Sequence, residues 1–171
     1  MSGAENAARL VHPIAPVVGP DARVLILGSF PSVKSREVGF YYGHPQNRFW
    51  RVLAALWGEP CPGSTAEKLA FLHRRHIALW DVIESCEITG SSDASIKNAR
   101  INDLAGLVGK APIRSVFFNG RTAERLYLRH ASGTIALPCR ALPSTSPANA
   151  GWSEARLIAA WQPVRDLADG L

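Results

Sequence analysis

The chain has few cysteines, and none of them are paired at short spacing. Cys61, Cys86 and Cys139 are the only three, and no CxxC pair is present among the 171 residues. Disulfide frameworks, zinc sites and iron–sulfur clusters depend on closely spaced thiols. We therefore expect isolated structural thiols, no metal site and no other cofactor.

Long hydrophobic runs are also lacking. The longest, such as Val24–Leu27 and Val116–Phe118, are far shorter than the about 20 apolar residues that span a bilayer. The first ten residues, MSGAENAARL, lack the apolar core of a signal peptide. We expect no membrane partner and a cytoplasmic location, in a bacterium.

Lysine is scarce although the chain is basic. Of the 19 basic residues only Lys34, Lys68, Lys97 and Lys110 are lysines, so 15 are arginines, and the formal net charge is +5. Arginine is the side chain better suited to bidentate phosphate contacts. This composition permits binding to a polyanion without establishing it.

Several common catalytic motifs are missing. The segment Gly28–Ser32, GSFPS, is neither GxGxxG nor GxxxxGK[ST], which argues against a nucleotide-phosphate cradle. No GxSxG elbow marks a serine hydrolase. His73 and His76 lie beside two arginines on what reads as a solvated helix end, a poor setting for a metal.

Short apolar runs alternate with helix patterns along the chain. This order predicts a three-layer α/β/α sandwich with a central, mainly parallel four-stranded sheet. We expect residues 1–20 to be an N-terminal arm and residues 21–171 to form a single domain. The predicted strands are Val24–Leu27, Ile77–Val82, Ser115–Asn119 and Arg140–Pro143. The predicted helices are Asn47–Trp57, a helix capped at Ser64 and running to Arg75, Ile101–Val108, Arg121–Ala131 and Ser153–Leu167, with Pro163 bending or ending the last.

Ligands of such folds bind at the carboxyl ends of the strands. That rule gathers four segments around one crevice: 28–32, 81–88, 119–121 and 144–150. The first of these segments, 28–32, is followed in the sequence by the aromatics Phe40, Tyr41 and Tyr42 and then by His44 and Asn47. A stacking surface, a histidine and a neutral amide suit a flat, uncharged ring better than a phosphate ester. Each part also has a plain structural reading: core packing, a loop histidine, a helix N-cap or a turn.

Three motifs carry a resemblance to a known family. They are VLILGSFPS followed by GFYYGHPQNRFW, then IALWDVIESCEITGSSDASIKN, and finally ALPSTSPANAGW, in order from about Val24 to Trp161. Together they resemble the uracil-DNA glycosylase superfamily, most closely its hypoxanthine (deoxyinosine) branch. The mismatch-specific uracil/thymine glycosylases are near relatives.

The chain departs from the family at three positions. Mismatch-type members have a water-orienting Asn where this chain has Phe30, and the resemblance moves the catalytic amide to Asn47. Family members commonly have His or Asn where this chain has Ser144, which argues against strong uracil activity. In addition, Ala148 stands where relatives insert a larger apolar wedge into DNA.

The resemblance implies a monofunctional DNA glycosylase that flips out a deaminated base, most simply hypoxanthine, and hydrolyses its N-glycosidic bond. Tyr42 would stack on the base, and the Asp81 carboxylate would accept its N–H, unless Asp81 only caps a turn. Two alternatives stay open: a uracil/thymine mismatch glycosylase and a catalytically silent DNA-binding module. We expect a monomer acting on double-stranded or single-stranded DNA. The implied substrate-binding residues are Gly28, Ser29, Phe30, Pro31, Tyr42, His44, Asp81 and Ser144, and the implied DNA-binding residues are Arg48, Ser146, Ala148 and Asn149.

Overall fold

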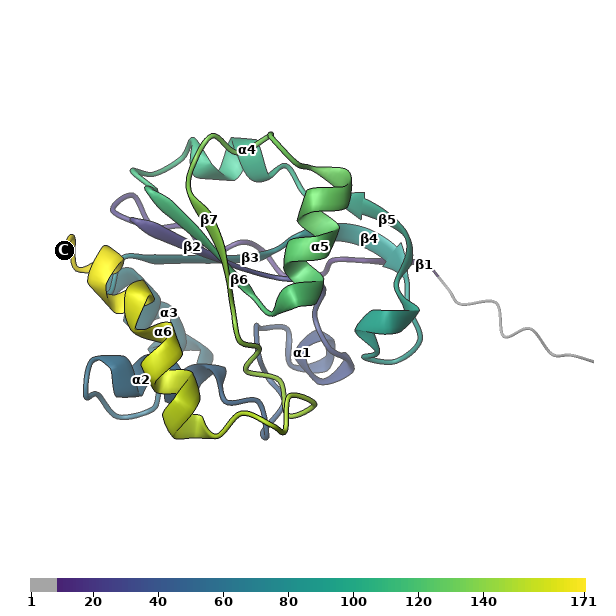
Figure 1. Ribbon diagram of the computed structural model, residues 1–171. Coiled ribbons are helices and arrows are strands. Elements are labelled where there is room, and N and C mark those ends of the chain that lie inside the picture. Colours follow the sequence, from purple (N-terminus) through teal and green to yellow (C-terminus); the bar gives the residue numbers. More distant parts are fainter. Residues whose placement is uncertain (1–8) are drawn as a thin grey trace, which may run out of the picture.

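A four-stranded parallel sheet forms the centre of the protein (Figure 1). The computed structural model describes residues 9–171. Its strands are β1 (Arg9–Val11), β2 (Val24–Gly28), β3 (Ile77–Asp81), β4 (Ile83–Glu87), β5 (Lys97–Ile101), β6 (Ser115–Asn119) and β7 (Cys139–Leu142). Its helices are α1 (Val33–Val38), α2 (Phe49–Leu56), α3 (Thr65–Arg74), α4 (Leu104–Val108), α5 (Arg121–His130) and α6 (Glu154–Ala168), with a 3-10 turn, η1, at Asp93–Ser95.

The sheet has the strand order β3-β2-β6-β7, and every neighbouring pair is parallel. All four strands were predicted from short apolar runs, and the predicted fold class is confirmed. Parallel ladders place all four carboxyl ends at one edge of the sheet. In β2 and β3 the register sets Gly28 directly opposite Asp81.

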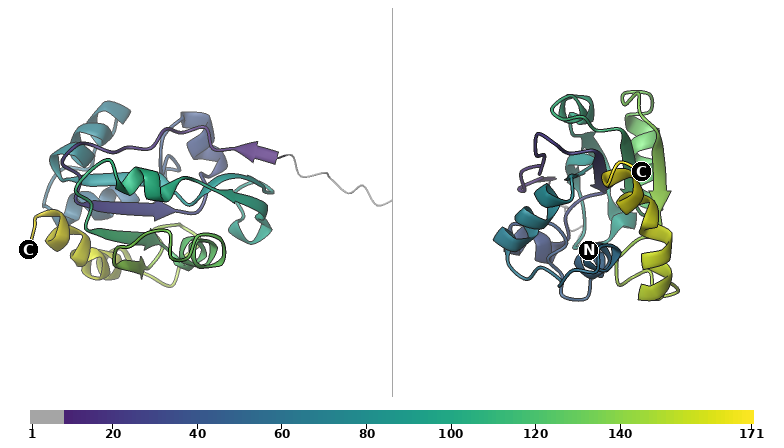
Figure 2. Two further views of the ribbon diagram at one scale, coloured as in Figure 1. Left: turned by 90° about the horizontal axis from the view of Figure 1, so that it is seen from above. Right: turned by 90° about the vertical axis from the view of Figure 1, so that its left-hand side faces the viewer.

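Both faces of this sheet are buried, which explains why its strands read as continuous apolar runs. Alternate residues of β2 enter two separate cores: Val24 and Ile26 pack with α2, α3 and α6, whereas Leu25 and Leu27 pack with α4 and α5. The right-hand view of Figure 2 shows α2, α3 and α6 below the sheet and α4 and α5 above it. The result is the predicted three-layer arrangement.

A second sheet was not predicted. It is antiparallel, has the order β1-β4-β5, and takes its first strand from the segment expected to be an arm. Residues 1–8 of that arm lie outside the described residues. The remainder is attached to the domain, because β1 pairs with β4 and the Val17 backbone bridges Leu79 of β3. Residues 9–17 therefore contribute to the sheets instead of leading up to them.

Other boundaries differ from the predictions for identifiable reasons. Residues 33–38, for which no helix was predicted, form α1, capped by Ser32, whose Oγ accepts from the Ser35 N–H at 3.1 Å. Residues 97–101, partly assigned to a helix, pair with β4 instead. Helix α6 continues through Pro163 to Ala168. No helix among the described residues is long and apolar enough to cross a membrane.

Candidate active site

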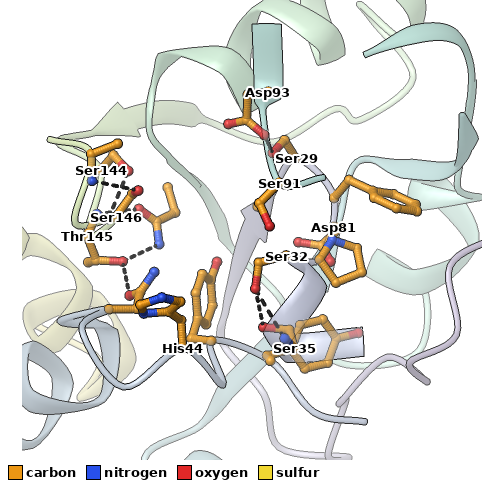
Figure 3. A pocket seen from close by; sticks show the side chains of 18 of the residues that line it. Ser29, Ser32, Ser35, His44, Asp81, Ser91, Asp93, Ser144, Thr145 and Ser146 are labelled. Carbon is orange, nitrogen blue, oxygen red and sulfur yellow. Dashed lines mark hydrogen bonds between the residues drawn. The ribbon is translucent and has the colours of Figure 1, made fainter. Parts of the chain in front are cut away.

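A cavity of about 320 Å³ opens at the carboxyl ends of the parallel strands (Figure 3). Strands β2, β3 and β6 contribute Gly28, Asp81 and Asn119 to its wall, and the loop after β7 closes another side. This is where the parallel-sheet rule placed the site. Every predicted site residue except Arg48 and Asn149 lines it: Gly28, Ser29, Phe30, Pro31, Tyr42, His44, Asn47, Asp81, Ser144, Ser146 and Ala148.

The floor of the cavity depends on the absence of a side chain at Gly28. A Cβ atom on Gly28 would lie 2.4 Å from Asp81 Oδ1 and 3.0 Å from the Tyr42 hydroxyl oxygen. The backbone of β2 thus lets a carboxylate and a phenol approach the same point from two sides. A glycine at the end of this strand is required by that close approach.

Asp81 is held in place by a histidine from the N-terminal segment. Its side chain is 5% exposed, and its Oδ2 accepts a hydrogen bond from His12 Nε2 at 2.7 Å. The other ring nitrogen of His12, Nδ1, accepts from the Ile14 N–H at 3.2 Å, so the proton of the neutral imidazole belongs on Nε2. His12 therefore donates to Asp81 Oδ2, while Asp81 Oδ1 lies next to Gly28 at the cavity.

Tyr42 is half-buried and has an unusual backbone conformation. Its φ of 52° lies in the left-handed region, which bulky residues rarely adopt and which costs of the order of 1–3 kcal/mol. Its ring stacks on Phe49 with centroids 3.9 Å apart. Burial, reinforced by the charge of Asp81, raises the pKa of the phenol far above its ordinary value. Among the described residues its hydroxyl oxygen makes no hydrogen bond, although the neighbouring Asn119 side chain acts to lower the same pKa; with the pKa raised overall, the phenol stays protonated.

Asn47 is fixed by a chain of side-chain hydrogen bonds. Its Oδ1 accepts from the Phe49 N–H at 3.0 Å and from the Thr145 hydroxyl at 2.9 Å. The Thr145 hydroxyl in turn accepts from Asn119 Nδ2 at 2.9 Å. Because the Phe49 backbone can only donate here, the amide orientation of Asn47 is determined. Its carbonyl oxygen is fully used, and the group left for the cavity is the Nδ2 amino group.

Thr145 and Asn119 were not predicted as site residues. Thr145 is fully buried, and its backbone N–H donates to Asn119 Oδ1 at 3.0 Å. The pair ties the end of β6 to the loop after β7 and to Asn47. Asn119 could have been found from the sequence, because it is a polar residue at the end of a buried strand. Thr145 could not, because the sequence does not distinguish it from the neighbouring hydroxyl residues Ser144 and Ser146.

Arg48 supports the loop that follows β7. It donates to the backbone carbonyls of Ser146 and Asn149, at 3.2 and 3.1 Å, and to that of Trp152. Asn149 Nδ2 closes the loop by donating to the Ser144 carbonyl at 3.0 Å. The guanidinium group expected to contact phosphate is thus directed at this loop and away from the cavity.

The remaining predicted residues lie at the mouth or the wall. His44 Nδ1 accepts from the Gln46 N–H at 3.1 Å, which leaves Nε2 to donate. Ser144 Oγ accepts from the Ser146 N–H at 3.1 Å. Phe30 packs edge-on against the ring of His12, with centroids 5.9 Å apart. These contacts give the cavity an apolar wall and a rim rich in hydroxyl and amide groups.

Asp93 was not predicted and lies beside Ser29 (Figure 3). It begins the 3-10 turn η1, lines the cavity, and accepts a hydrogen bond from the Ser29 hydroxyl at 2.9 Å. Partial burial raises the pKa of its carboxyl, against the lowering effect of that hydrogen bond. His12 was also missed and had no signal in the sequence, because it lies in a segment read as an arm.

Cysteines and metal-type clusters take no part in this geometry. Cys86 is buried, and Cys61 and Cys139 are exposed, all three as free thiols. Within residues 9–171, no group of three or more His, Cys, Asp and Glu side chains is arranged to hold a metal ion. The polar groups of the cavity are thus a carboxylate pair, amides, hydroxyls and a histidine.

Comparison with known proteins gives consistent results. The family model described as the uracil DNA glycosylase superfamily matches residues 15–168. Hypoxanthine DNA glycosylase of Methanosarcina acetivorans is 38% identical over 150 residues, which cover 86% of this chain and 93% of the relative. The protein of the same name from Methanosarcina barkeri is 36% identical over 151 residues, covering 82% and 94%. A solution NMR structure of a Methanosarcina acetivorans protein assigned as a uracil DNA glycosylase superposes with a TM-score of 0.74 at 34% identity, covering 91% of this chain and 99% of that one.

Proposed function

Because the chain belongs to the uracil DNA glycosylase superfamily, we propose that it is a monofunctional DNA glycosylase that removes hypoxanthine from deoxyinosine in DNA, in base excision repair. The observation that carries this proposal is the Asp81 carboxylate, fixed by His12 on one oxygen and placed at the cavity with the other. The names of the two Methanosarcina relatives support the same substrate.

Base recognition follows from the hydrogen-bonding pattern of the ring. Hypoxanthine carries an N1–H donor beside its O6 acceptor, whereas adenine has an acceptor at N1. An ionised carboxylate can only accept, so Asp81 Oδ1 matches the N1–H and repels the adenine edge. Stacking on an aromatic ring adds roughly 1–3 kcal/mol per base, and Tyr42, backed by Phe49, is our candidate for it.

Asn47 has a limited but definite role in the hydrolysis. A glycosylase must position a water molecule against C1′ while positive charge develops on the deoxyribose. The Asn47 amino group can hold that water by donating to its oxygen, and fixing a reactant in attack geometry is worth several kcal/mol. An amide cannot remove a proton at neutral pH. We assign Asn47 to water positioning, and His44 to the rim that holds the leaving base.

The loop 144–150 is our candidate for the DNA-contacting edge. Ser146, Ala148 and Asn149 lie on it, with Arg48 acting from beneath through the loop carbonyls. Arg121, whose side chain is 86% exposed and pairs with Glu124 at 3.5 Å, adds a cation beside the loop for phosphate. We propose that the protein acts as a monomer on double-stranded or single-stranded DNA, in the cytoplasm at nucleoid DNA. The two curated relatives are archaeal, so a bacterial source stays a prediction.

The experiment is a panel of duplexes containing hypoxanthine, uracil, xanthine or a thymine mismatch, assayed for alkali-labile sites. We expect cleavage at hypoxanthine by the wild type, and a loss of about 10²-fold or more with Asn47→Ala, since water positioning is lost. Preferential cleavage at uracil or mismatched thymine would favour the mismatch glycosylase. DNA binding without cleavage of any of these bases would identify a silent binding module.

A further inference from the structure

Hydrolysis of the glycosidic bond needs a group that accepts a proton from the attacking water. Asn47 cannot supply it, because its Oδ1 already accepts from the Phe49 N–H and the Thr145 hydroxyl. Asp81 is occupied by His12 and, under the proposed function, by the base edge. The cavity lining holds one further carboxylate, Asp93.

The position of Asp93 relative to the scissile bond can be read from two neighbouring hollows. Besides the base cavity, a second hollow lies over the exposed side of the 144–150 loop and includes Gly120, Arg121 and Trp152. The residues that line both are Asp93, Ser144, Ser146 and Ala148. A nucleotide with its base in the cavity and its backbone in the second hollow has its glycosidic bond where the two meet. Asp93 is the only one of the four that bears a charge.

The segment that carries Asp93 is held firmly against the rest of the site. The Ser91 hydroxyl accepts from the Val33 N–H at 2.9 Å, and the Arg36 guanidinium donates to the Gly90 carbonyl at 2.8 Å. Ser95 Oγ accepts from the Thr89 N–H at 2.9 Å and donates to the Ser92 carbonyl at 2.6 Å. These bonds fix the turn that presents the carboxylate, and Ser29 orients one of its oxygens.

We propose that Asp93 is the catalytic base of this glycosylase, an inference that rests on the proposed function. The Asn47 amino group donates to the water, and Asp93 takes one of its protons. The water oxygen forms the bond to C1′ as the C1′–N9 bond breaks, and the electron pair of that bond leaves with hypoxanthine. The base is then protonated from solvent, and Asp93 returns its proton to solvent. While the C1′–N9 bond is breaking, the anionic carboxylate also stabilises the positive charge on the sugar.

The titratable groups that face Asp93 are Asp81, Tyr42, Cys86 and Arg125. Asp81 raises the pKa of Asp93 and Arg125 lowers it, with burial as the larger effect in the raising direction. A carboxylate whose pKa is raised is a better proton acceptor than an ordinary one. The rate of excision should therefore rise with pH through the titration of Asp93 and then level off.

The test compares the wild type with Asp93→Asn in single-turnover excision of hypoxanthine from duplex DNA, with Asp21→Asn as a matched control. Asp21 is exposed and lines neither hollow. We expect Asp93→Asn to lower the rate by about 10²–10⁴-fold, to retain binding of an uncleavable 2′-fluorinated deoxyinosine duplex, and to lose the rising limb of the pH profile. Asp21→Asn should match the wild type.

Two outcomes would contradict this account in different ways. If the wild type releases hypoxanthine and Asp93→Asn does so equally fast with the same pH profile, Asp93 is not the base. If the wild type releases no hypoxanthine, the proposed function itself fails. A slow Asp93→Asn protein that also loses the duplex would reduce Asp93 to a binding role and overturn the inference.

Discussion

Replacing Gly28 by alanine tests whether the site depends on the close approach of Asp81 to the strand. The added Cβ would lie 2.4 Å from Asp81 Oδ1, whereas ordinary contact begins at 3.4 Å, so the carboxylate must move by 1.0 Å. It cannot move freely, because its backbone pairs with β2 and its Oδ2 is bonded to His12 at 2.7 Å. Overpacking of this kind costs about 1–3 kcal/mol. A displacement of about 1 Å at a reacting site can cost about 10²-fold in rate.

Gly63→Ala provides the matched control. Nothing lies within 4 Å of a Cβ at Gly63, and neither glycine has a positive φ, so the two variants differ mainly in what the methyl group meets. We expect Gly28→Ala to lower the melting temperature by about 2–4 °C for each kcal/mol lost and to lower kcat/KM for hypoxanthine excision by about 10²-fold. Gly63→Ala should alter neither. Activity of Gly28→Ala within twofold of the wild type would refute the assigned role of the Gly28–Asp81 contact.

Three further predictions follow from other contacts. His12→Leu leaves the buried Asp81 carboxyl without the donor that lies 2.7 Å from its Oδ2, so urea unfolding should show a loss of about 1.5–3 kcal/mol in the free energy of unfolding. His12→Gln, which keeps a donor, should lose less. An equal loss in the two variants would contradict the role of this hydrogen bond. The lysine in Arg48→Lys cannot reach three carbonyls at once, so KM for DNA should rise several-fold. The control Arg51→Lys, at an exposed ion pair with Glu154, should change the free energy of unfolding by less than about 1 kcal/mol. A KM of Arg48→Lys equal to that of the wild type would contradict the support role of Arg48. Because the pKa of Asp93 is raised in the folded protein, ionisation of Asp93 lowers the stability of the fold as the pH rises through that pKa. Asp93→Asn should therefore be more stable than the wild type at pH 7, and the difference should vanish in acid. An Asp93→Asn protein less stable than the wild type at pH 7 would contradict this.

The central sheet was readable from the sequence because its strands are buried on both faces. A short, continuous apolar run such as Val24–Leu27 is typical of a strand that is buried on both faces. The second sheet was not readable, since Lys97–Ile101 is partly exposed and its pairing with β4 is set by tertiary contact and not by pattern. The same holds for β1, three residues long, whose partners are more than 70 positions away.

The residues of the site also differ in whether the sequence could predict them. Asp81 was expected at the cavity because chain order alone brings the strand ends to one edge of the sheet, whereas Asn47 was expected there from the resemblance; both residues line the cavity. His12 comes from a segment read as an arm, and its position depends on the second sheet. Asp93 lies within IALWDVIESCEITGSSDASIKN, the second motif of the resemblance, but its place at the cavity depends on the turn η1. The amide of Asn47 was predicted, but the use of its carbonyl oxygen by Thr145 required three-dimensional contacts.

The most direct test of the account is the release of hypoxanthine compared with adenine from otherwise identical duplexes, under single-turnover conditions with the wild-type protein. A carboxylate at Asp81 that accepts from N1–H and repels an N1 acceptor predicts rapid release of hypoxanthine and none of adenine. Asp81→Asn, which can donate as well as accept, should narrow that difference. Failure of the wild type to release hypoxanthine, or equal discrimination by Asp81→Asn, would contradict the account.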